Sequence, residues 1–226
     1  IPRSLENDIY HWERNKNIIS NFLNIARIIQ AKRVVFISSA GSVYPPHQNK
    51  KFDELERTYA CNNYGKQKLK AEQMISEFVK DKDIKCTILR VATAYGYDKR
   101  FSDQGVINKW LHAAINNQIL RVYNSIDSLI NFISFDQISD AIKGSIKNEI
   151  NGIYNIGSIE RTSLYEILLE IEQTVQRKIN YQILSEELRN FNIDVGKFYK
   201  ETGILYKNEI TKNIKFIHDS IIRNDL

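Results

Sequence analysis

Tyr64 and Lys68 are two side chains with complementary acid–base chemistry, four residues apart. On a helix this spacing places both on one face, one turn apart. A phenol is a poor base at neutral pH, but an adjacent ammonium favours the phenolate and lowers its pKa. The pair could therefore take a proton from a bound substrate and return it.

The surroundings of Tyr64 matter because the same spacing recurs at Tyr95 and Lys99, and an isolated tyrosine is usually just a partly buried aromatic. Tyr64 opens a predicted helix soon after the segment S-S-A-G-S-V-Y, which runs from Ser38 to Tyr44. Hydroxyls at the carboxyl end of a parallel strand lie where open α/β sheets bind ligands. The alternative is that these serines and the glycine only form a turn. Tyr95 and Lys99 are predicted to lie in a loop.

Apolar spacing predicts the elements that hold these residues. It indicates helices over 6–31 and 64–79 and continuous apolar strands over 33–39 and 84–91. This alternation is typical of right-handed β-α-β units, so the predicted fold is α/β, a Rossmann-like doubly wound parallel sheet. Further along we predict helices over 104–116, 136–147, 163–176 and 208–222, and strands over 119–123, 132–135 and 152–156. We expect the sheet domain to span 1–100 and a small C-terminal α/β lobe, interleaved with the last sheet elements, to span 101–226.

The composition of the 226 residues narrows the function classes. The 32 basic and 27 acidic residues are interleaved, so the net charge of +5 predicts no nucleic-acid platform. No apolar run approaches the roughly 20 residues of a membrane span, and the first residues do not resemble a secretory signal, so we expect no membrane partner and a cytoplasmic location. Cys61 and Cys86 stand far apart with no histidine cluster nearby, which predicts neither a metal site nor a disulfide framework.

Several segments resemble the extended short-chain dehydrogenase/reductases, and among them the NAD-dependent nucleotide-sugar epimerase/dehydratase family. The resemblance lies in the serine segment, in Y-G-K-Q-K from Tyr64 and in L-R-V-A-T-A-Y-G from Leu89, and their order and spacing agree with that family. It extends upstream to the helix containing Asn15 and downstream to the segments that begin at Gln104, Asn131 and Gly152. It covers nearly the whole chain and weakens after Ser185.

The resemblance implies roles for individual residues. Tyr64 would act as the base on a sugar hydroxyl while NAD takes a hydride, giving a transient keto-sugar, and Lys68 would bind the nicotinamide ribose and hold the phenolate. Ala40 occupies the usual position of the assisting hydroxyl, so Ser39 is the first choice for that role and Ser42 the second. The implied cofactor-binding residues are Asn15, Ser38, Ser39, Tyr64, Lys68 and Val91. The implied substrate-binding residues are Thr93, Arg121 and Asn131.

Three departures from the family pattern affect the prediction. Gly41 and Ser42 stand where dehydratases carry an acidic pair, which favours an epimerase or a reductase. Asn131 stands where relatives place an arginine facing the diphosphate, so either another basic residue, such as Arg121 or Arg189, takes that charge or the substrate is unusual. The family's glycine-rich pyrophosphate segment is missing among the 9 glycines, so we expect roughly 80 residues of the Rossmann half-domain upstream of Ile1.

The function expected from the resemblance is an NAD(P)-dependent nucleotide-sugar epimerase that supplies sugars for surface polysaccharides. Its cofactor would be NAD, with NADP as the alternative, and its substrate a nucleotide-diphosphate sugar. Apolar residues on the helices over 6–31 and 64–79 exceed what one buried face needs, which predicts a homodimer. The alternatives are a nucleotide-sugar reductase or dehydratase of the same superfamily, and a non-catalytic dinucleotide-binding sensor or scaffold.

Overall fold

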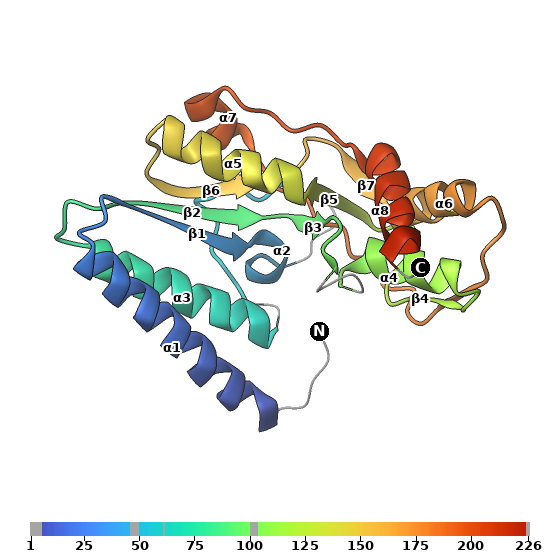
Figure 1. The fold of residues 1–226 in the computed structure, drawn as a ribbon, viewed down its shortest axis with the longest axis horizontal. Helices are drawn as coiled ribbons and strands as arrows, with labels where there is room; N and C mark the ends of the chain where they lie inside the picture. The colour runs from blue at the N-terminus through green and yellow to red at the C-terminus, as the bar shows by residue number, and fades with distance from the viewer. Residues whose placement is uncertain (1–5, 46–49, 61, 100–103, 225–226) are drawn as a thin grey trace.

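A parallel sheet of three strands forms the centre of one end of the molecule (Figure 1). The computed structural model describes residues 6–45, 50–60, 62–99 and 104–224. The sheet has the strand order β1-β2-β6, and all neighbouring strands are parallel. Its strands are β1 (Arg33–Ser39), β2 (Lys85–Val91) and β6 (Gly152–Ile156). In this register the last residues of the three strands align, so their carboxyl ends form one edge, and the predicted parallel α/β sheet is confirmed.

Helices cover both faces of this sheet, α1 and α3 on one and α5 and α7 on the other (Figure 1). Alternate residues of β2 enter opposite cores: Ile88 packs with Leu23 and Ile75, and Leu89 with Ala141 and Phe198. A strand buried on both faces must be apolar on both, which explains the continuous apolar runs in the sequence. The four helices are α1 (Glu6–Ile28), α3 (Asn63–Val79), α5 (Phe135–Lys147) and α7 (Gly196–Thr202).

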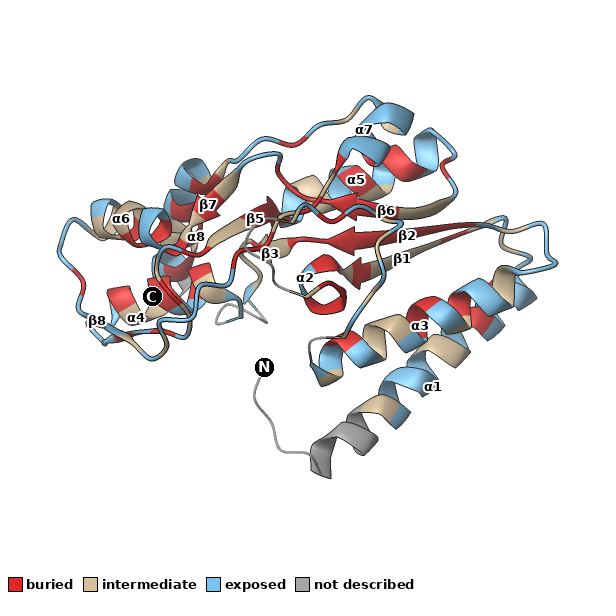
Figure 2. Cartoon of the chain, turned by 180° about the vertical axis from the view of Figure 1, so that it is seen from behind, coloured by how far each residue is buried: buried red, intermediate tan, exposed pale blue. Residues whose placement is uncertain are grey.

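A lobe with its own core lies at the other end of the molecule, as Figure 2 shows. Fully buried side chains such as Leu111, Ile167 and Ile214 join its three helices. These helices are α4 (Val106–Ile115), α6 (Leu164–Val175) and α8 (Ile210–Asn224). Its short strands are β3 (Thr93–Tyr95), β4 (Leu120–Val122), β5 (Leu129–Ser134), β7 (Arg161–Ser163) and β8 (Tyr181–Ile183).

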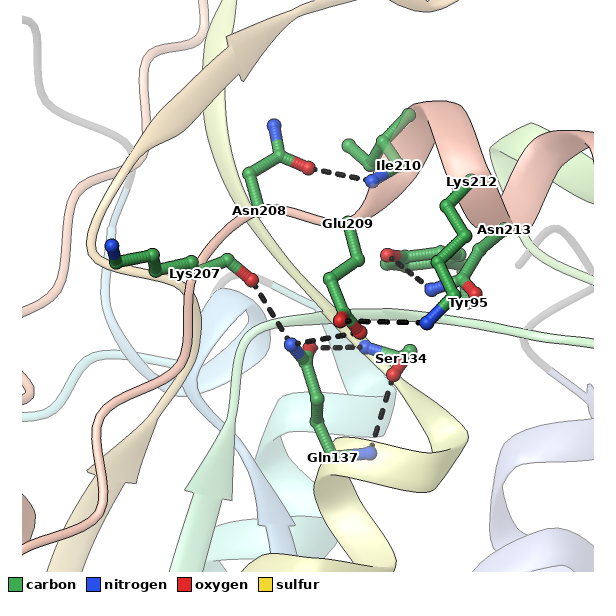
Figure 3. A network of polar contacts seen from close by, with 9 residues as sticks. All are labelled: Tyr95, Ser134, Gln137, Lys207, Asn208, Glu209, Ile210, Lys212 and Asn213. Atoms are coloured by element: carbon green, nitrogen blue, oxygen red, sulfur yellow. Dashed lines mark hydrogen bonds and ion pairs between the residues drawn. The ribbon is translucent and has the colours of Figure 1, made fainter.

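The start of α8 is tied to the ends of β3 and β5 by a polar network (Figure 3). Asn213 donates through Nδ2 to the hydroxyl of Tyr95 at 3.1 Å, and the Gln137 amide donates to the backbone carbonyl of Lys207 at 3.0 Å. Ser134 and Gln137 form a reciprocal capping box at the start of α5. The bond of Gln137 thereby joins the segment before α8 to α5, one of the helices that cover the sheet. Tyr95 was predicted in a loop, but it is the last residue of β3 and only 3% exposed.

Most predicted elements are confirmed, and the differences lie in short segments. The bounds predicted for β1 and β6 match the structure, whereas α2 (Ala40–Val43), α7 and strands β3, β7 and β8 were not predicted. The predicted domain boundary at 100 and 101, and Cys61, lie outside the described residues. Among the described helices, none is both long and apolar enough to cross a membrane.

Candidate active site

The candidate site lies where β1 and β2 end, at the carboxyl edge of the sheet. Ser39 and Val91 are register partners and the last residues of these strands. The chain turns directly from Ser39 into α2, and the Ser39 hydroxyl lies 3.2 Å from that of Ser42. The two serines proposed to assist Tyr64 are thus hydrogen-bonded neighbours, Ser39 half-buried and Ser42 buried.

The start of α3 is pressed against α2. Asn62 caps the helix, its side-chain oxygen accepting from the backbone N–H of Gly65 at 2.8 Å. Gly65 lies against the backbone carbonyl of Ser42 so closely that a Cβ would overlap the oxygen. The absence of a side chain at this position lets α3 begin beside the serine turn. The contact brings Tyr64, the second residue of α3, to the edge that holds Ser39.

Tyr64 and Lys68 lie on the same side of α3. The Lys68 Nζ is 5.5 Å from the centroid of the Tyr64 ring and 5.0 Å from that of Phe36. Tyr64 is 37% exposed, so its ring is partly open to solvent. The spacing therefore does place both side chains on one face of the helix.

The predicted lowering of the Tyr64 pKa is not found. Burial raises the pKa of Tyr64 above its ordinary value. The Lys68 amine donates instead to the backbone carbonyl of Ile37 at 2.8 Å. In this structure Tyr64 is therefore a neutral phenol at physiological pH.

Below this pair, a buried ionic cluster joins α3 to the sheet. Glu72 is 6% exposed and pairs with the Arg90 guanidinium on β2, at 2.7 Å from Nη2 and 3.1 Å from Nε. The Ser38 hydroxyl donates to the same carboxylate. Arg90 also donates to the hydroxyl of Tyr44 at 2.7 Å, and Tyr44 donates to Asn155 on β6. Ser38, expected at the cofactor, is thus 3% exposed and its hydroxyl is bonded inside this cluster.

Other predicted residues lie at different distances from this edge. Asn15 is exposed on α1 and donates to the side chain of Gln67 on α3 at 2.7 Å, one residue before Lys68. Thr93 is half-buried on β3, two residues past the end of β2. Arg121 is exposed on β4 in the lobe. Arg189 is exposed and pairs with Glu187 at 2.6 Å.

Asn131 is buried and bonded to the backbone at both ends of its amide. It is 0% exposed, its Nδ2 donates to the carbonyl of Ser158 at 2.9 Å, and its Oδ1 accepts from the N–H of Ile193 at 3.0 Å. Both ends of the amide are therefore occupied by backbone groups. The side chain holds β5 to the segments on either side of it, and because it is fully buried neither end of the amide is open to solvent.

Sequence reasoning missed Glu72, Arg90 and Gly65. Glu72 continues the spacing of Tyr64 and Lys68 by another four residues, which places it on the same helix face. Arg90 is the one basic residue within the apolar run over 86–91, and a charge inside a two-sided buried strand needs a partner. These two signals together could have predicted the pair. Gly65 could not be found this way, because its role depends on the position of α2.

Comparison with known families gives one match over this part of the chain. The model described as the NAD dependent epimerase/dehydratase family matches residues 1–157. That range includes the edge with Ser39, Tyr64 and Lys68. A candidate UDP-glucose 4-epimerase of Methanocaldococcus jannaschii is 27% identical over 171 residues, covering 74% of this chain and 55% of the relative. The chain thus spans about half the length of this curated relative.

Solved structures show the same fold over nearly the whole chain. UDP-glucose 4-epimerase of Thermotoga maritima, solved with UDP-glucose, has a TM-score of 0.87 at 17% identity. The match covers 99% of this chain and 74% of the Thermotoga chain. UDP-N-acetylglucosamine 4-epimerase of Methanobrevibacter ruminantium M1, in complex with UDP-N-acetylmuramic acid, has a TM-score of 0.83 at 20% identity, covering 93% and 69%. UDP-glucuronic acid 4-epimerase of Bacillus cereus, with UDP-glucuronic acid and NAD, has a TM-score of 0.83 at 18% identity, covering 93% and 68%.

Proposed function

The chain belongs to the NAD dependent epimerase/dehydratase family, and from this premise we propose that it forms the catalytic edge and substrate lobe of an NAD-dependent UDP-sugar 4-epimerase. The observation that carries the proposal is the arrangement at the end of β1, where the start of α3, with Tyr64 and Lys68, lies against the turn that follows Ser39. The curated relative and the three solved neighbours are all named as 4-epimerases of UDP-sugars.

The proposed chemistry is proton transfer by Tyr64. Once deprotonated, its half-exposed side chain is the base that takes the proton from the 4-hydroxyl of the sugar. It returns the proton after the transient keto-sugar has rotated in the site. The hydroxyl of Ser39, or of Ser42 as second choice, shares the hydrogen bond of the sugar hydroxyl. Because burial raises the pKa of Tyr64 here, its phenolate must be stabilised when substrate and cofactor bind, and Lys68 is the nearest cation to do so.

The residues at this edge fit the nicotinamide end of a bound NAD, which would take up and return the hydride. The Lys68 ammonium has three donors, and among the described residues one is used, toward Ile37. The other two are available to ribose hydroxyls. Val91 offers an apolar neighbour at the end of β2. Asn15 supports this face of α3 through Gln67.

The nucleotide-sugar would bind between this edge and the lobe, with Thr93 on the sheet side and Arg121 on the lobe side. Arg121 is exposed, and a guanidinium suits a diphosphate. Asn131 is left out of the proposed set because both ends of its amide are occupied. A supply of sugars for surface polysaccharides is proposed as the cellular role.

We also propose a homodimer through α1 and α3. An exposed apolar stripe follows α1 through Ile18, Phe22 and Ile25, at 56%, 43% and 57% exposed, and ends at Ile29, one residue past the helix, at 65%. Their spacing puts them along one side of the helix, and a stripe of this kind is suited to burial between two molecules. Sedimentation that gives only monomer at micromolar concentration would contradict this.

Interconversion of UDP-hexoses tests the function. The native protein is assayed with UDP-glucose, UDP-N-acetylglucosamine and UDP-glucuronic acid in the presence of NAD. We expect Tyr64→Phe to lower kcat by about 100-fold or more, the scale of a lost general base. The matched control is Tyr199→Phe, an exposed tyrosine on α7, which should retain activity. Full turnover by Tyr64→Phe would remove Tyr64 from the mechanism.

A further inference from the structure

We propose that Glu72 is a positioning residue for Lys68, holding its amine protonated and in place beside Ile37 at the end of β1. The inference rests on the proposed function only for its consequence in catalysis. It concerns a buried carboxylate that touches neither substrate nor cofactor in the mechanism above.

Two adjacent residues of β1 bind two successive turns of α3. The carbonyl of Ile37 accepts from Lys68, and the hydroxyl of the next residue, Ser38, donates to Glu72. Lys68 and Glu72 are four residues apart, so both side chains project from the helix face that meets the strand. The strand therefore fixes the amine and the carboxylate relative to each other.

The carboxylate of Glu72 is held in a set position by the neighbouring strand. Ser38 on β1 and Arg90 on β2 are register partners, and both side chains converge on Glu72. Arg90 binds both carboxylate oxygens, which fixes the orientation of the group. A buried pair of this kind is weak evidence for stability, because desolvation offsets much of its attraction. A role in placing a charge near Lys68 accounts for it better.

The charge of Glu72 acts against the burial of Lys68. Burial lowers the pKa of the half-buried Lys68, and the Glu72 carboxylate acts in the opposite direction. α1 meets this stretch of α3 through the uncharged contact of Asn15 with Gln67 and through Lys70, whose Nζ lies 4.8 Å from the centroid of the Trp12 ring. The ionisable groups with a described relation to Lys68 are Tyr64, whose ring lies under the amine, and Glu72. Arg90 is bonded to Glu72, and Tyr44 to Arg90.

Direct titration of the Lys68 amine tests the proposal. Lysines are methylated with carbon-13, the Lys68 resonance is assigned with Lys68→Arg, and its shift is followed with pH. We expect Glu72→Gln, which keeps the shape of the side chain and removes its charge, to move the Lys68 titration to lower pH. The matched control is Glu77→Gln on the exposed face of the same helix, which should leave it unchanged.

An unchanged Lys68 titration in folded Glu72→Gln protein would overturn the proposal. Should this variant fail to fold, the Lys68 titration in Glu72→Gln combined with Arg90→Gln is compared with that in Arg90→Gln alone, because these two proteins differ only in the charge of Glu72. We expect the Lys68 titration to lie at lower pH in the double variant.

Activity gives a separate readout. If the polypeptide is an epimerase, its loss of activity at high pH moves to lower pH in Glu72→Gln, because Lys68 then loses its proton earlier. If no variant, including wild type, converts a UDP-sugar, the proposed function fails while the titration still decides the role of Glu72.

Discussion

Gly65 lies against the backbone carbonyl of Ser42, leaving no room for a side chain between α3 and α2. The residue next to the proposed base thus sets how near the helix comes to the serine turn. Any atom added at this position has to push α3 outward, and Tyr64 moves with it.

Replacement of this glycine should therefore harm both stability and activity. We expect Gly65→Ala to lower the free energy of unfolding by about 1–3 kcal/mol, the usual cost of overpacking, and to lower turnover as Tyr64 moves away from the serine turn. Chemical denaturation and the epimerase assay measure the two effects. The matched control is Gly41→Ala in the same turn, where a Cβ would meet nothing within 4 Å. Equal stability of the two variants would show that α3 adjusts freely.

Asn131 should act on stability rather than on ligand binding. We expect Asn131→Leu to cost about 1–3 kcal/mol for each of the two backbone groups that it leaves without a partner, the carbonyl of Ser158 and the N–H of Ile193. Thermal unfolding measures this cost. Asn116→Leu, at an exposed position, is the control. Calorimetric titration with UDP should give the same Kd for folded Asn131→Leu as for wild type. A large loss of affinity would show that Asn131 takes part in substrate binding.

Cys86 should make the protein less stable in alkali. It is 7% exposed in the core between the sheet and α3, and burial raises its pKa to about 11. An unfolded thiol titrates near about 8.5, so the folded protein keeps a proton that the unfolded chain loses between these values. The contribution of the neutral thiol is present below the unfolded pKa and is lost as pH rises through the folded one.

Urea denaturation at several pH values checks this sign. The stability of wild type relative to Cys86→Ala should fall by about 2–3 kcal/mol at most between pH 8 and pH 11. Using the difference between the two proteins removes the titration of the lysines and tyrosines that they share. A difference that stays constant over this range would mean that Cys86 keeps its ordinary pKa in the fold.

The part of the structure that could be predicted best from the sequence is the sheet. The bounds of β1 and β6 could be predicted because a strand covered on both faces must be apolar throughout, and polar residues mark where it ends. Strands β3, β7 and β8 have three residues each, too few to show a period, and they form through pairing with distant partners. Tyr95 was misplaced for this reason.

At the site, helical spacing predicted which side chains share a face, but the direction of the Tyr64 pKa shift could not be predicted from the sequence. A spacing of four residues predicts that Tyr64 and Lys68 share a face, and they do. The direction of the Tyr64 pKa could not be predicted, because it depends on how far the ring is buried and on the carbonyl of Ile37, which draws the amine of Lys68 toward the strand. The environment of Asn131 likewise depends on the later segment at Ile193.

The paired contacts of Ile37 with Lys68 and of Ser38 with Glu72 have a bearing on how this protein tolerates change. These two hydrogen bonds join β1 to α3, so the helix cannot shift along its axis or rotate about it without breaking both. The phenol of Tyr64 is thus located from two sides, by β1 through these contacts and by α2 through Gly65. A change on one side is opposed by the other, so the position of the reactive hydroxyl does not depend on a single contact.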